Sequence, residues 1–311
     1  MTLIYAMPGN EVFAELLVQH TGYSRAGLFL HRFPDGETRV RVDAPLKGEQ
    51  AVLVCTLDRP DPKLWPLTMA ASTLRELGAR RVVLVAPYLA YMRQDARFHP
   101  GEAISARLLG AWLDHYFDAL VTVDPHLHRY HSLSQIYSRE ARLVHAAAEL
   151  TAWIASRVER PLLVGPDEES RQWITAVANL LCAPSVVAHK ERHGDREVTV
   201  HLPELSRWLD HTPVLLDDII ASGQTMLQTL RSLRAYTKAK PICVAVHGVF
   251  AEGTLEALRS EGASEIATSN GIATETSQID ISRPVAEALM DISSVINLRR
   301  SDEMPSSRNV M

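Results

Sequence analysis

The sequence VLLDDIIASGQTM, from Val214 to Met226, holds the pattern that decides the fold. Three apolar residues, Val214 to Leu216, run directly into Asp217 and Asp218, and a loop of small residues follows before an apolar helical pattern begins at Met226. A short apolar run predicts a buried strand, and small polar residues before a periodic segment predict a turn and a helix start. We therefore expect a strand, a turn and a helix in succession.

The loop Ala221-Ser222-Gly223-Gln224-Thr225 has the composition of a phosphate site. Gly223 permits backbone geometry that a side chain would forbid. The Ser222 and Thr225 hydroxyls join the unpaired N–H groups of the helix start around one small volume, which suits a phosphate.

The acid pair Asp217 and Asp218 cannot bind phosphate, but it can accept hydrogen bonds from vicinal sugar hydroxyls or hold a divalent cation. A phosphate site beside a diol site indicates a phosphorylated sugar. The plainer interpretation is that the acids only cap the helix and that Ser-Gly is an ordinary turn. We favour the first interpretation because strand, acid pair and S-G-x-T loop occur in one run.

This stretch resembles the ribose-5-phosphate-binding loop of the type I phosphoribosyltransferase fold. By that resemblance, the loop from Ala221 to Thr225 cradles the 5-phosphate, while Asp217 and Asp218 hold the ribose hydroxyls. The motif alone does not separate phosphoribosyltransferases from ribose-phosphate pyrophosphokinases, the enzymes that make phosphoribosyl pyrophosphate (PRPP). The rest of the chain has to decide between them.

The chain has 311 residues, of which 46% are hydrophobic, enough for two domains with sizeable cores. Its net charge of -5 gives no overall attraction to nucleic acid or to an anionic membrane, so small phosphorylated ligands fit better. No apolar run reaches spanning length and the N-terminus lacks a secretory pattern, so we expect a cytoplasmic protein. Cys55, Cys182 and Cys243 sit singly in apolar surroundings, which predicts buried free thiols.

Two halves of the chain repeat the same order of elements. Alternating strands and helices predict an α/β fold with parallel sheets, right-handed crossovers and sites at the carboxyl ends of strands. We expect two tandem phosphoribosyltransferase-like domains, residues 1–143 and 144–289, each a mostly parallel sheet flanked by helices. Residues 290–311 are expected to pack back on the first domain and end in a frayed tail. The repeated strand, helix and strand are Ala51 to Cys55, Leu64 to Leu77 and Arg81 to Ala86 in the first half, and Val214 to Leu216, Met226 to Tyr236 and Ile242 to Val246 in the second.

The segment from Pro87 to Ser105 distinguishes the first half, because it is long, polar and rich in Arg. Spacing alone favours a solvated loop. However, the sequences YMRQD and GEAIS within it resemble the nucleotide-binding loop of ribose-phosphate pyrophosphokinases, and the R-F-x-P-G-E-x-I-S ending is closer to archaeal members. The resemblance implies that Arg93 and Gln94 approach ATP, a co-substrate used with Mg²⁺.

The sequence Phe33-Pro34-Asp35-Gly36-Glu37 taken alone is a turn between two strands, with Asp-Gly supplying the bend. It also resembles the pyrophosphokinase segment that reaches into a neighbouring subunit and holds adenine. That resemblance implies that Phe33, Asp35 and Glu37 contact ATP, and that the protein is a homo-oligomer whose active site lies at a subunit interface.

Two further strand ends carry candidate metal residues. Asp124-Pro125-His126 follows the predicted strand Ala119 to Val123 and matches the D-x-H motif of the family, so His126 is assigned to the Mg-nucleotide site. A zinc site would need a further protein ligand, and no cysteine is near in sequence. Asp167, after the strand Leu162 to Val164, matches the family's metal-facing Asp.

The residues after Asp167 depart from the family pattern, because Glu168 and Glu169 replace a glycine-containing pyrophosphate loop. The two acids would repel pyrophosphate unless a cation intervened. One hypothesis is that one of them positions a second Mg²⁺. The equally weighted alternative is a solvated helix start, where acids are favoured by the helix dipole.

The segment His189 to Arg196 taken alone is a charged surface hairpin. Its K-x-R sequence, Lys190 and Arg192, resembles the mobile catalytic loop of the pyrophosphokinases. Negative charge grows on the phosphoryl oxygens during transfer, so cations there have a clear role. The resemblance implies that Lys190 and Arg192 are catalytic.

The resemblance to pyrophosphokinases covers the chain from about Phe33 to about Leu289. It implies transfer of the pyrophosphoryl group of Mg-ATP to ribose 5-phosphate, giving PRPP and AMP. Two alternatives stay open: a phosphoribosyltransferase that consumes PRPP, and a non-catalytic relative that binds nucleotide and regulates a partner.

Overall fold

The computed structural model describes residues 1–43, 46–127, 129–193, 197–234, 236 and 238–302, with side chains described except at 190–200 and 293–302. Two compact units make up the chain. Unit 1 is Met1–Val144 with the C-terminal segment from Ser282, and unit 2 is His145–Ile281.

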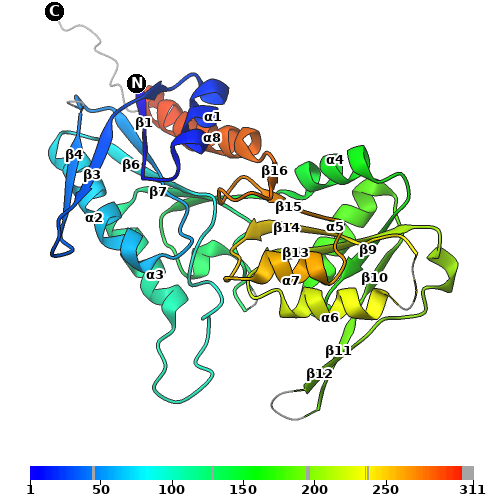
Figure 1. Cartoon of the computed structure of the whole chain (residues 1–311). Coiled ribbons are helices and arrows are strands. Elements are labelled where there is room, and N and C mark those ends of the chain that lie inside the picture. The colour runs from blue at the N-terminus through cyan, green and yellow to red at the C-terminus, as the bar shows by residue number, and fades with distance from the viewer. Residues whose placement is uncertain (44–45, 128, 194–196, 235, 237, 303–311) are drawn as a thin grey trace, which may run out of the picture. The chain divides into compact units, whose positions relative to one another are not determined.

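Unit 1 is a six-stranded parallel sheet in the order β2-β1-β5-β6-β7-β8, with helices on both of its faces (Figure 1). An antiparallel hairpin, β3 with β4, lies beside α2. The strands are β1 (Thr2–Ala6), β2 (Ser24–Arg25), β3 (Leu28–Arg32), β4 (Thr38–Val42), β5 (Gln50–Val54), β6 (Arg81–Ala86), β7 (Ala119–Val123) and β8 (Glu140–Val144); the helices are α1 (Glu11–Thr21), α2 (Asp61–Glu76), α3 (Ser105–Tyr116), the 3-10 turn Leu133–Gln135 and α8 (Ser282–Asp302).

Unit 2 is also a six-stranded parallel sheet, in the order β10-β9-β13-β14-β15-β16, and an antiparallel hairpin, β11 with β12, extends from it. The strands are β9 (Pro161–Gly165), β10 (Ser185–Val187), β11 (His189–His193), β12 (Glu197–His201), β13 (Thr212–Ile220), β14 (Ile242–Gly248), β15 (Glu265–Ser269) and β16 (Ser277–Ile279); the helices are α4 (Ala147–Arg157), α5 (Arg171–Leu181), α6 (Gln224–Leu233), α7 (Thr254–Ser260) and the 3-10 turns Glu168–Ser170 and Ser206–Trp208.

Buried parallel strands explain both cores. β6 reads RVVLVA and β14 reads ICVAVHG, near-continuous apolar runs with both faces covered. On one face of unit 1, alternate strand residues such as Leu53 and Leu84 pack against α2 and α3. In unit 2, Leu215 and Cys243 pack in the same way against the apolar side of α6. The expected α/β class with two mostly parallel sheets flanked by helices is confirmed.

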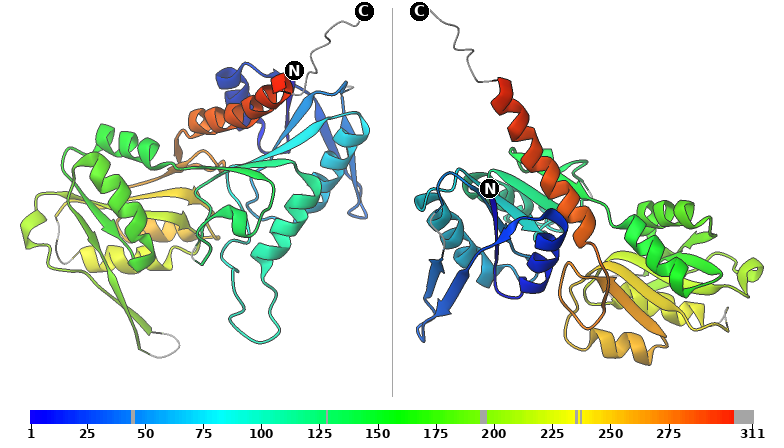
Figure 2. Two further views of the ribbon diagram at one scale, coloured as in Figure 1. Left: turned by 180° about the vertical axis from the view of Figure 1, so that it is seen from behind. Right: turned by 90° about the horizontal axis from the view of Figure 1, so that it is seen from above.

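The division between the units differs from the sequence-based boundaries of 143/144 and 289/290. The first division falls after Val144. The second falls before Ser282, because α8 is one continuous helix that begins there and packs against α1 and β8 of unit 1. Its residues Val285 and Leu289 are fully buried. The helix lies alongside α1 in two views (Figures 1 and 2).

The strand that carries the acid pair is longer than predicted. β13 continues through Asp217 and Asp218 to Ile220, whereas the apolar run ends at Leu216. The neighbouring strand β14 reaches Gly248 and pairs with β13 up to Ile220, so backbone pairing continues beyond the apolar run. The acids lie within the strand, and their expected place after it is wrong.

The cysteine prediction is correct at two positions of three. Cys55 and Cys243 are buried free thiols, and burial raises the pKa of each to about 12. Cys182 is exposed, because it ends α5 in a left-handed conformation with φ 51° and therefore faces away from the core. Among the described residues, no helix combines the length and the apolar character that crossing a membrane requires.

Candidate functional site

The glycine loop of unit 2 has the geometry of an anion site. Gly223 has φ +68°, a left-handed conformation that other residues rarely adopt, and a Cβ at this position would lie 2.8 Å from Thr254 Cγ2. Glycine is therefore required for two reasons. Helix α6 begins at Gln224, two residues earlier than predicted, so Gln224 and Thr225 lie in its first turn.

The segment that joins β14 to α7 holds this loop in place by hydrogen bonds. The Ala221 carbonyl accepts hydrogen bonds from the Ala251 N–H (3.0 Å) and the Thr254 hydroxyl (3.1 Å). The Leu227 N–H donates to the Gly223 carbonyl (2.8 Å), so the preceding N–H groups of the helix lie before the first intrahelical bond. Ser222 and Gln224 are exposed beside these donors. Together with the helix dipole, the arrangement favours a phosphate.

The acids of β13 form a strongly negative cluster with Asp167. Asp218 is only 8% exposed, and its N–H donates to the Asp217 carboxylate (3.0 Å). Burial raises the pKa of Asp217 well above its usual range, and the charges of Asp218 and Asp167 add to that rise. The ionised form of Asp217 is therefore disfavoured, and hydrogen-bond donors or a cation beside the carboxylate would stabilise it.

The segment after β9 positions Asp167 as a cap. The Asp167 carboxylate accepts from the Ser170 N–H (3.3 Å), and the Ser170 hydroxyl donates to the Asp167 carbonyl (2.6 Å). Gly165 is needed below this turn, because a Cβ there would lie 2.4 Å from Ser170 Oγ.

Glu168 and Glu169 are both exposed. The Arg171 guanidinium donates to the Glu168 carboxylate (2.7 Å), and this hydrogen bond lowers the pKa of Glu168. The pairing fits the solvated helix start weighed above. Among the described residues, no group of three or more His, Cys, Asp and Glu side chains is arranged to hold a metal ion by itself.

The K-x-R segment forms strand β11, whose partner β12 places Val200 opposite Lys190 and Val198 opposite Arg192. A hairpin is thus correct for the backbone. The side chains of Lys190 and Arg192 lie outside the described residues, so their catalytic role stays a prediction.

In unit 1, the segment between β6 and α3 folds as a long loop closed by a turn at Gly101, which has φ +87° (Figure 1). The Glu102 carboxylate accepts from the Phe98 N–H (2.9 Å) and the His99 N–H (3.0 Å). The Gln94 side-chain amide donates to the same carboxylate and to the Ala96 carbonyl, both at 3.3 Å. Arg93 is exposed and makes no hydrogen bond or ion pair within the described residues.

His126 is half-buried just beyond β7. The preceding Asp124 is 1% exposed and holds φ +37°, an uncommon conformation at a strand end where function is often found. Arg129 links this segment to the loop that carries Gln94, because its guanidinium contacts the Asp95 carboxylate (2.6 Å). Sequence reasoning missed Arg129, since its partner lies 34 residues away and no local spacing reveals the contact.

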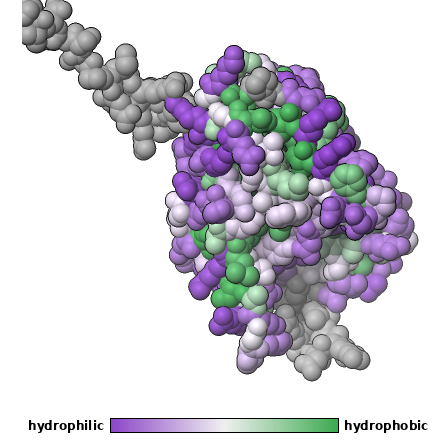
Figure 3. Space-filling view, turned by 90° about the vertical axis from the view of Figure 1, so that its left-hand side faces the viewer, coloured by the Kyte–Doolittle hydropathy of each residue, from purple (hydrophilic) through white to green (hydrophobic). Residues whose placement is uncertain are grey.

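The segment from Phe33 to Glu37 is the turn of the β3–β4 hairpin. The Phe33 N–H donates to the Glu37 carbonyl (2.8 Å), Gly36 has φ +93°, and the Asp35 carboxylate accepts from the Glu37 N–H (3.0 Å). The Phe33 ring is partly exposed, with the Arg39 guanidinium 6.0 Å from its centre. Figure 3 shows the hairpin side of the molecule as a hydrophilic surface with separate apolar patches.

Comparison with known proteins gives the same result for both halves. Residues 2–116 match the family model for the N-terminal domain of ribose phosphate pyrophosphokinase, and residues 132–278 match the phosphoribosyl transferase domain. The chain is 32% identical to the ribose-phosphate pyrophosphokinase of Sulfurisphaera tokodaii, over 83% of this chain and 89% of the relative. It is 33% identical to that of Methanopyrus kandleri, over 84% of this chain and 89% of the relative.

A solved structure supports the fold. The phosphoribosylpyrophosphate synthetase from Mycobacterium smegmatis aligns with a TM-score of 0.82 and 23% identity, covering 94% of this chain and 99% of that chain. The expected resemblance, including its archaeal character, is confirmed by these relatives.

Proposed function

The chain belongs to the ribose-phosphate pyrophosphokinase family, and from this premise we propose how its residues make PRPP. The reaction transfers the pyrophosphoryl group of Mg-ATP to the anomeric hydroxyl of ribose 5-phosphate and releases AMP. One observation carries the assignment: an acid-bearing strand, β13, leads through Gly223 into the open start of α6.

Unit 2 is proposed to hold ribose 5-phosphate. The N–H groups and hydroxyls of Ser222, Gly223, Gln224 and Thr225 accommodate the 5-phosphate, with Ala221 at the base of the loop. Asp217 and Asp218 accept hydrogen bonds from the ribose hydroxyls, which offset the burial and the repulsion that raise the pKa of Asp217. The sugar is thereby oriented with its anomeric hydroxyl available for attack.

The negative cluster of Asp217, Asp218 and Asp167 also fits a divalent cation. Mg²⁺ commonly binds through one or two carboxylates and completes its shell with water and substrate oxygens, so a ready-made cage of three side chains is not needed. We propose that Asp167 and His126 serve the metal-bound substrate. Mg²⁺ would supply charge neutralisation at the phosphate oxygens.

Unit 1 is proposed to hold ATP. Arg93, exposed and available, offers a forked donor that matches phosphate geometry. Gln94 would reach the nucleotide by exchanging its bond to Glu102, a 3.3 Å contact. Phe33 offers an exposed ring for stacking, while Asp35 and Glu37 offer acceptors for the exocyclic amine of adenine.

Lys190 and Arg192 are proposed to act during transfer itself. The anomeric hydroxyl attacks the β-phosphorus in line, the bond from that phosphorus to the oxygen retained by AMP breaks, and negative charge grows on the non-bridging oxygens. A lysine ammonium and an arginine guanidinium would neutralise that charge. Catalysis is otherwise positioning, with no covalent enzyme intermediate.

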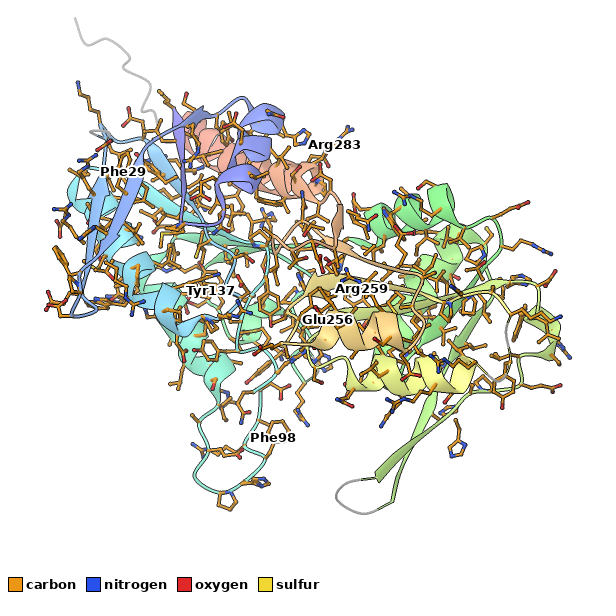
Figure 4. All side chains as sticks on the ribbon, in the orientation of Figure 1. Phe29, Phe98, Tyr137, Glu256, Arg259 and Arg283 are labelled. Carbon is orange, nitrogen blue, oxygen red and sulfur yellow. The ribbon has the colours of Figure 1, made fainter. Side chains whose placement is uncertain are left out.

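We further propose a homo-oligomer in which the β3–β4 hairpin serves a neighbouring subunit. The support is the hairpin's exposed aromatic surface, since Phe29 is 49% exposed and Phe33 is 37% exposed. Phe29 lies on β3, one of the two strands of this hairpin (Figure 4).

The proposed function is tested by incubating the protein with Mg-ATP and ribose 5-phosphate and measuring AMP and PRPP together. We expect equal amounts of both, and no AMP when ribose replaces ribose 5-phosphate. A phosphoribosyltransferase would consume added PRPP with a base and form no AMP here. A non-catalytic regulator would bind ATP and form neither product with any divalent metal, which would overturn the proposal.

A further inference from the structure

Asp95 is a buried acid in the loop between β6 and α3. It is 5% exposed, whereas Arg93, Arg97 and Phe98 on either side are exposed. A buried carboxylate is costly unless it is paired and hydrogen-bonded, so the partners of Asp95 determine how this loop is held.

The partners of Asp95 come from the segment that follows His126. The Arg129 guanidinium donates to one carboxylate oxygen (2.6 Å) and the Arg129 N–H donates to the other (3.1 Å). The Tyr130 hydroxyl donates to the Asp95 carbonyl (3.3 Å), and Arg107 of α3 donates to that hydroxyl (3.0 Å). The loop that carries Arg93 and Gln94 is thus joined at Asp95 to the segment that follows His126.

Arg129 also reaches the outer part of the loop. Its guanidinium carbon lies 5.2 Å from the centre of the Phe98 ring, within the range of a cation–π contact. Phe98 is 53% exposed and lies on the long loop below α3 (Figure 4). One side chain therefore contacts both the buried base of the loop and its exposed aromatic residue.

This arrangement fixes the residues that follow Arg93 and leaves the Arg93 guanidinium exposed. Asp95 lies two residues after Arg93, and the Gln94 carbonyl accepts from the Ala106 N–H at the start of α3 (3.2 Å). The backbone on the C-terminal side of Arg93 is held, and the guanidinium itself is exposed.

We propose that Arg129 is a positioning residue for the nucleotide: it sets the loop that presents Arg93 and Gln94 in register with His126. This inference rests on the proposed function, since those three residues are the proposed ATP contacts. It implies that loss of the guanidinium weakens nucleotide binding and leaves ribose 5-phosphate binding in unit 2 unchanged.

The test compares R129A and R129K with the control R139A, which removes an exposed arginine from the same unit. Calorimetry measures the affinity of each protein for a non-hydrolysable methylene analogue of ATP with Mg²⁺, and separately for ribose 5-phosphate. We expect R129A to bind the analogue about tenfold more weakly, because a buried acid loses its charged partner. R129K should fall between, since an ammonium keeps the charge but not the forked, stacking geometry.

A second variant separates the pair from general damage to the fold. D95N with R129A should bind the analogue no more weakly than R129A alone, because both changes remove one interaction. Affinity for ribose 5-phosphate should stay within about twofold throughout. Equal affinity of R129A and R139A for the analogue would overturn the inference, as would a parallel loss of both ligands.

The binding experiment also distinguishes the two proposals from each other. If the wild-type protein makes no PRPP but R129A binds the analogue more weakly, the proposed function fails and the role of Arg129 stands. If the wild-type protein makes PRPP and R129A binds the analogue normally, only the role of Arg129 fails.

Discussion

The two units share one strand order and differ in the loops that follow equivalent strands. β5 in unit 1 and β13 in unit 2 occupy the same place in their sheets. After β13 comes the glycine loop, whereas after β5 comes Thr56, whose carbonyl accepts from Lys63 (2.9 Å), and a helix that begins with the acidic Asp61. An acid in the first turn occupies the position that an anion would need. Of the two equivalent helix starts, the one in unit 2 has the geometry proposed for a phosphate, and the one in unit 1 does not.

The loops after the next pair of equivalent strands, β6 and β14, differ in the opposite direction: the longer loop lies in unit 1. After β6, unit 1 has the long segment 87–104, which includes Arg93 and the buried Asp95. After β14, unit 2 has only residues 249–253, which lead directly to α7. One sheet thus carries the loop proposed for the nucleotide and the other the loop proposed for the sugar phosphate, so one repeated fold would serve two different substrates.

The largest expected effect comes from Lys190. K190A should lower turnover on the order of 10²- to 10³-fold, because a cation that acts mainly in the transition state contributes about 3 to 4 kcal/mol. Steady-state kinetics with Mg-ATP and ribose 5-phosphate measures it, with K238A, an exposed lysine of the same unit, as the control. A fall of less than about tenfold would remove Lys190 from the catalytic group.

The glycine loop comes next, and it tests the difference between the units directly. G223A should lower kcat/KM for ribose 5-phosphate on the order of 10²-fold, because the loop must move away from Thr254 and misplace the phosphate. The control G253A has a similar φ of +76° but no atom within 4 Å of the added Cβ. If both variants lost activity equally, backbone strain rather than the shape of the phosphate site would be the cause.

Asp217 should show a conflict between stability and function. D217N should lower activity about 10- to 100-fold, since a hydrogen bond to a charged group is lost. Because burial and neighbouring acids raise the pKa of Asp217, the unfolded chain releases this proton at lower pH than the folded protein does. Wild-type stability therefore falls as pH rises above about 4 and through the raised pKa.

D217N removes that loss, so its unfolding temperature at pH 7 should exceed the wild-type value, and the gain should vanish as pH falls to about 4. Thermal unfolding followed by circular dichroism measures the difference across pH. The control D210N removes an exposed acid whose pKa is lowered, mainly by its hydrogen bond with His211. This variant should show no gain in unfolding temperature. A destabilised D217N at pH 7 would contradict the electrostatic account.

The smallest effect is expected at the site of the family departure. E168A combined with E169A should change turnover by less than about twofold and leave its magnesium dependence unaltered, because Glu168 forms an exposed pair with Arg171. A magnesium titration of activity measures this. A shifted requirement for the metal would restore the hypothesis that these acids position a second Mg²⁺.

Much of the fold could be predicted from the sequence, because buried parallel strands are continuous apolar runs. The predicted bounds of Arg81–Ala86 and Ala119–Val123 agree with β6 and β7 to the residue. β13 was predicted too short, since an acid pair looks like a strand end when the neighbouring strand cannot be seen. The start of α8 was missed for a similar reason, because its packing against α1 depends on distant sequence.

The candidate site was predictable where chemistry is local. The loop at Gly223 and the pairing of Glu168 with Arg171 follow from spacing along the chain. The pair of Asp95 and Arg129 could not be predicted, because only the folded sheet brings the ends of β6 and β7 together. The roles assigned by resemblance to Phe33, His126 and Lys190 stay predictions.

The central claim is that each unit serves one substrate, and ligand binding to two variants tests it most directly. Calorimetry with R93A and G223A would measure the affinity of each for the Mg²⁺ complex of a methylene ATP analogue and for ribose 5-phosphate. We expect R93A to lose affinity only for the nucleotide and G223A to lose affinity only for the sugar phosphate. Loss of both ligands in either variant, or the opposite pattern, would contradict the account.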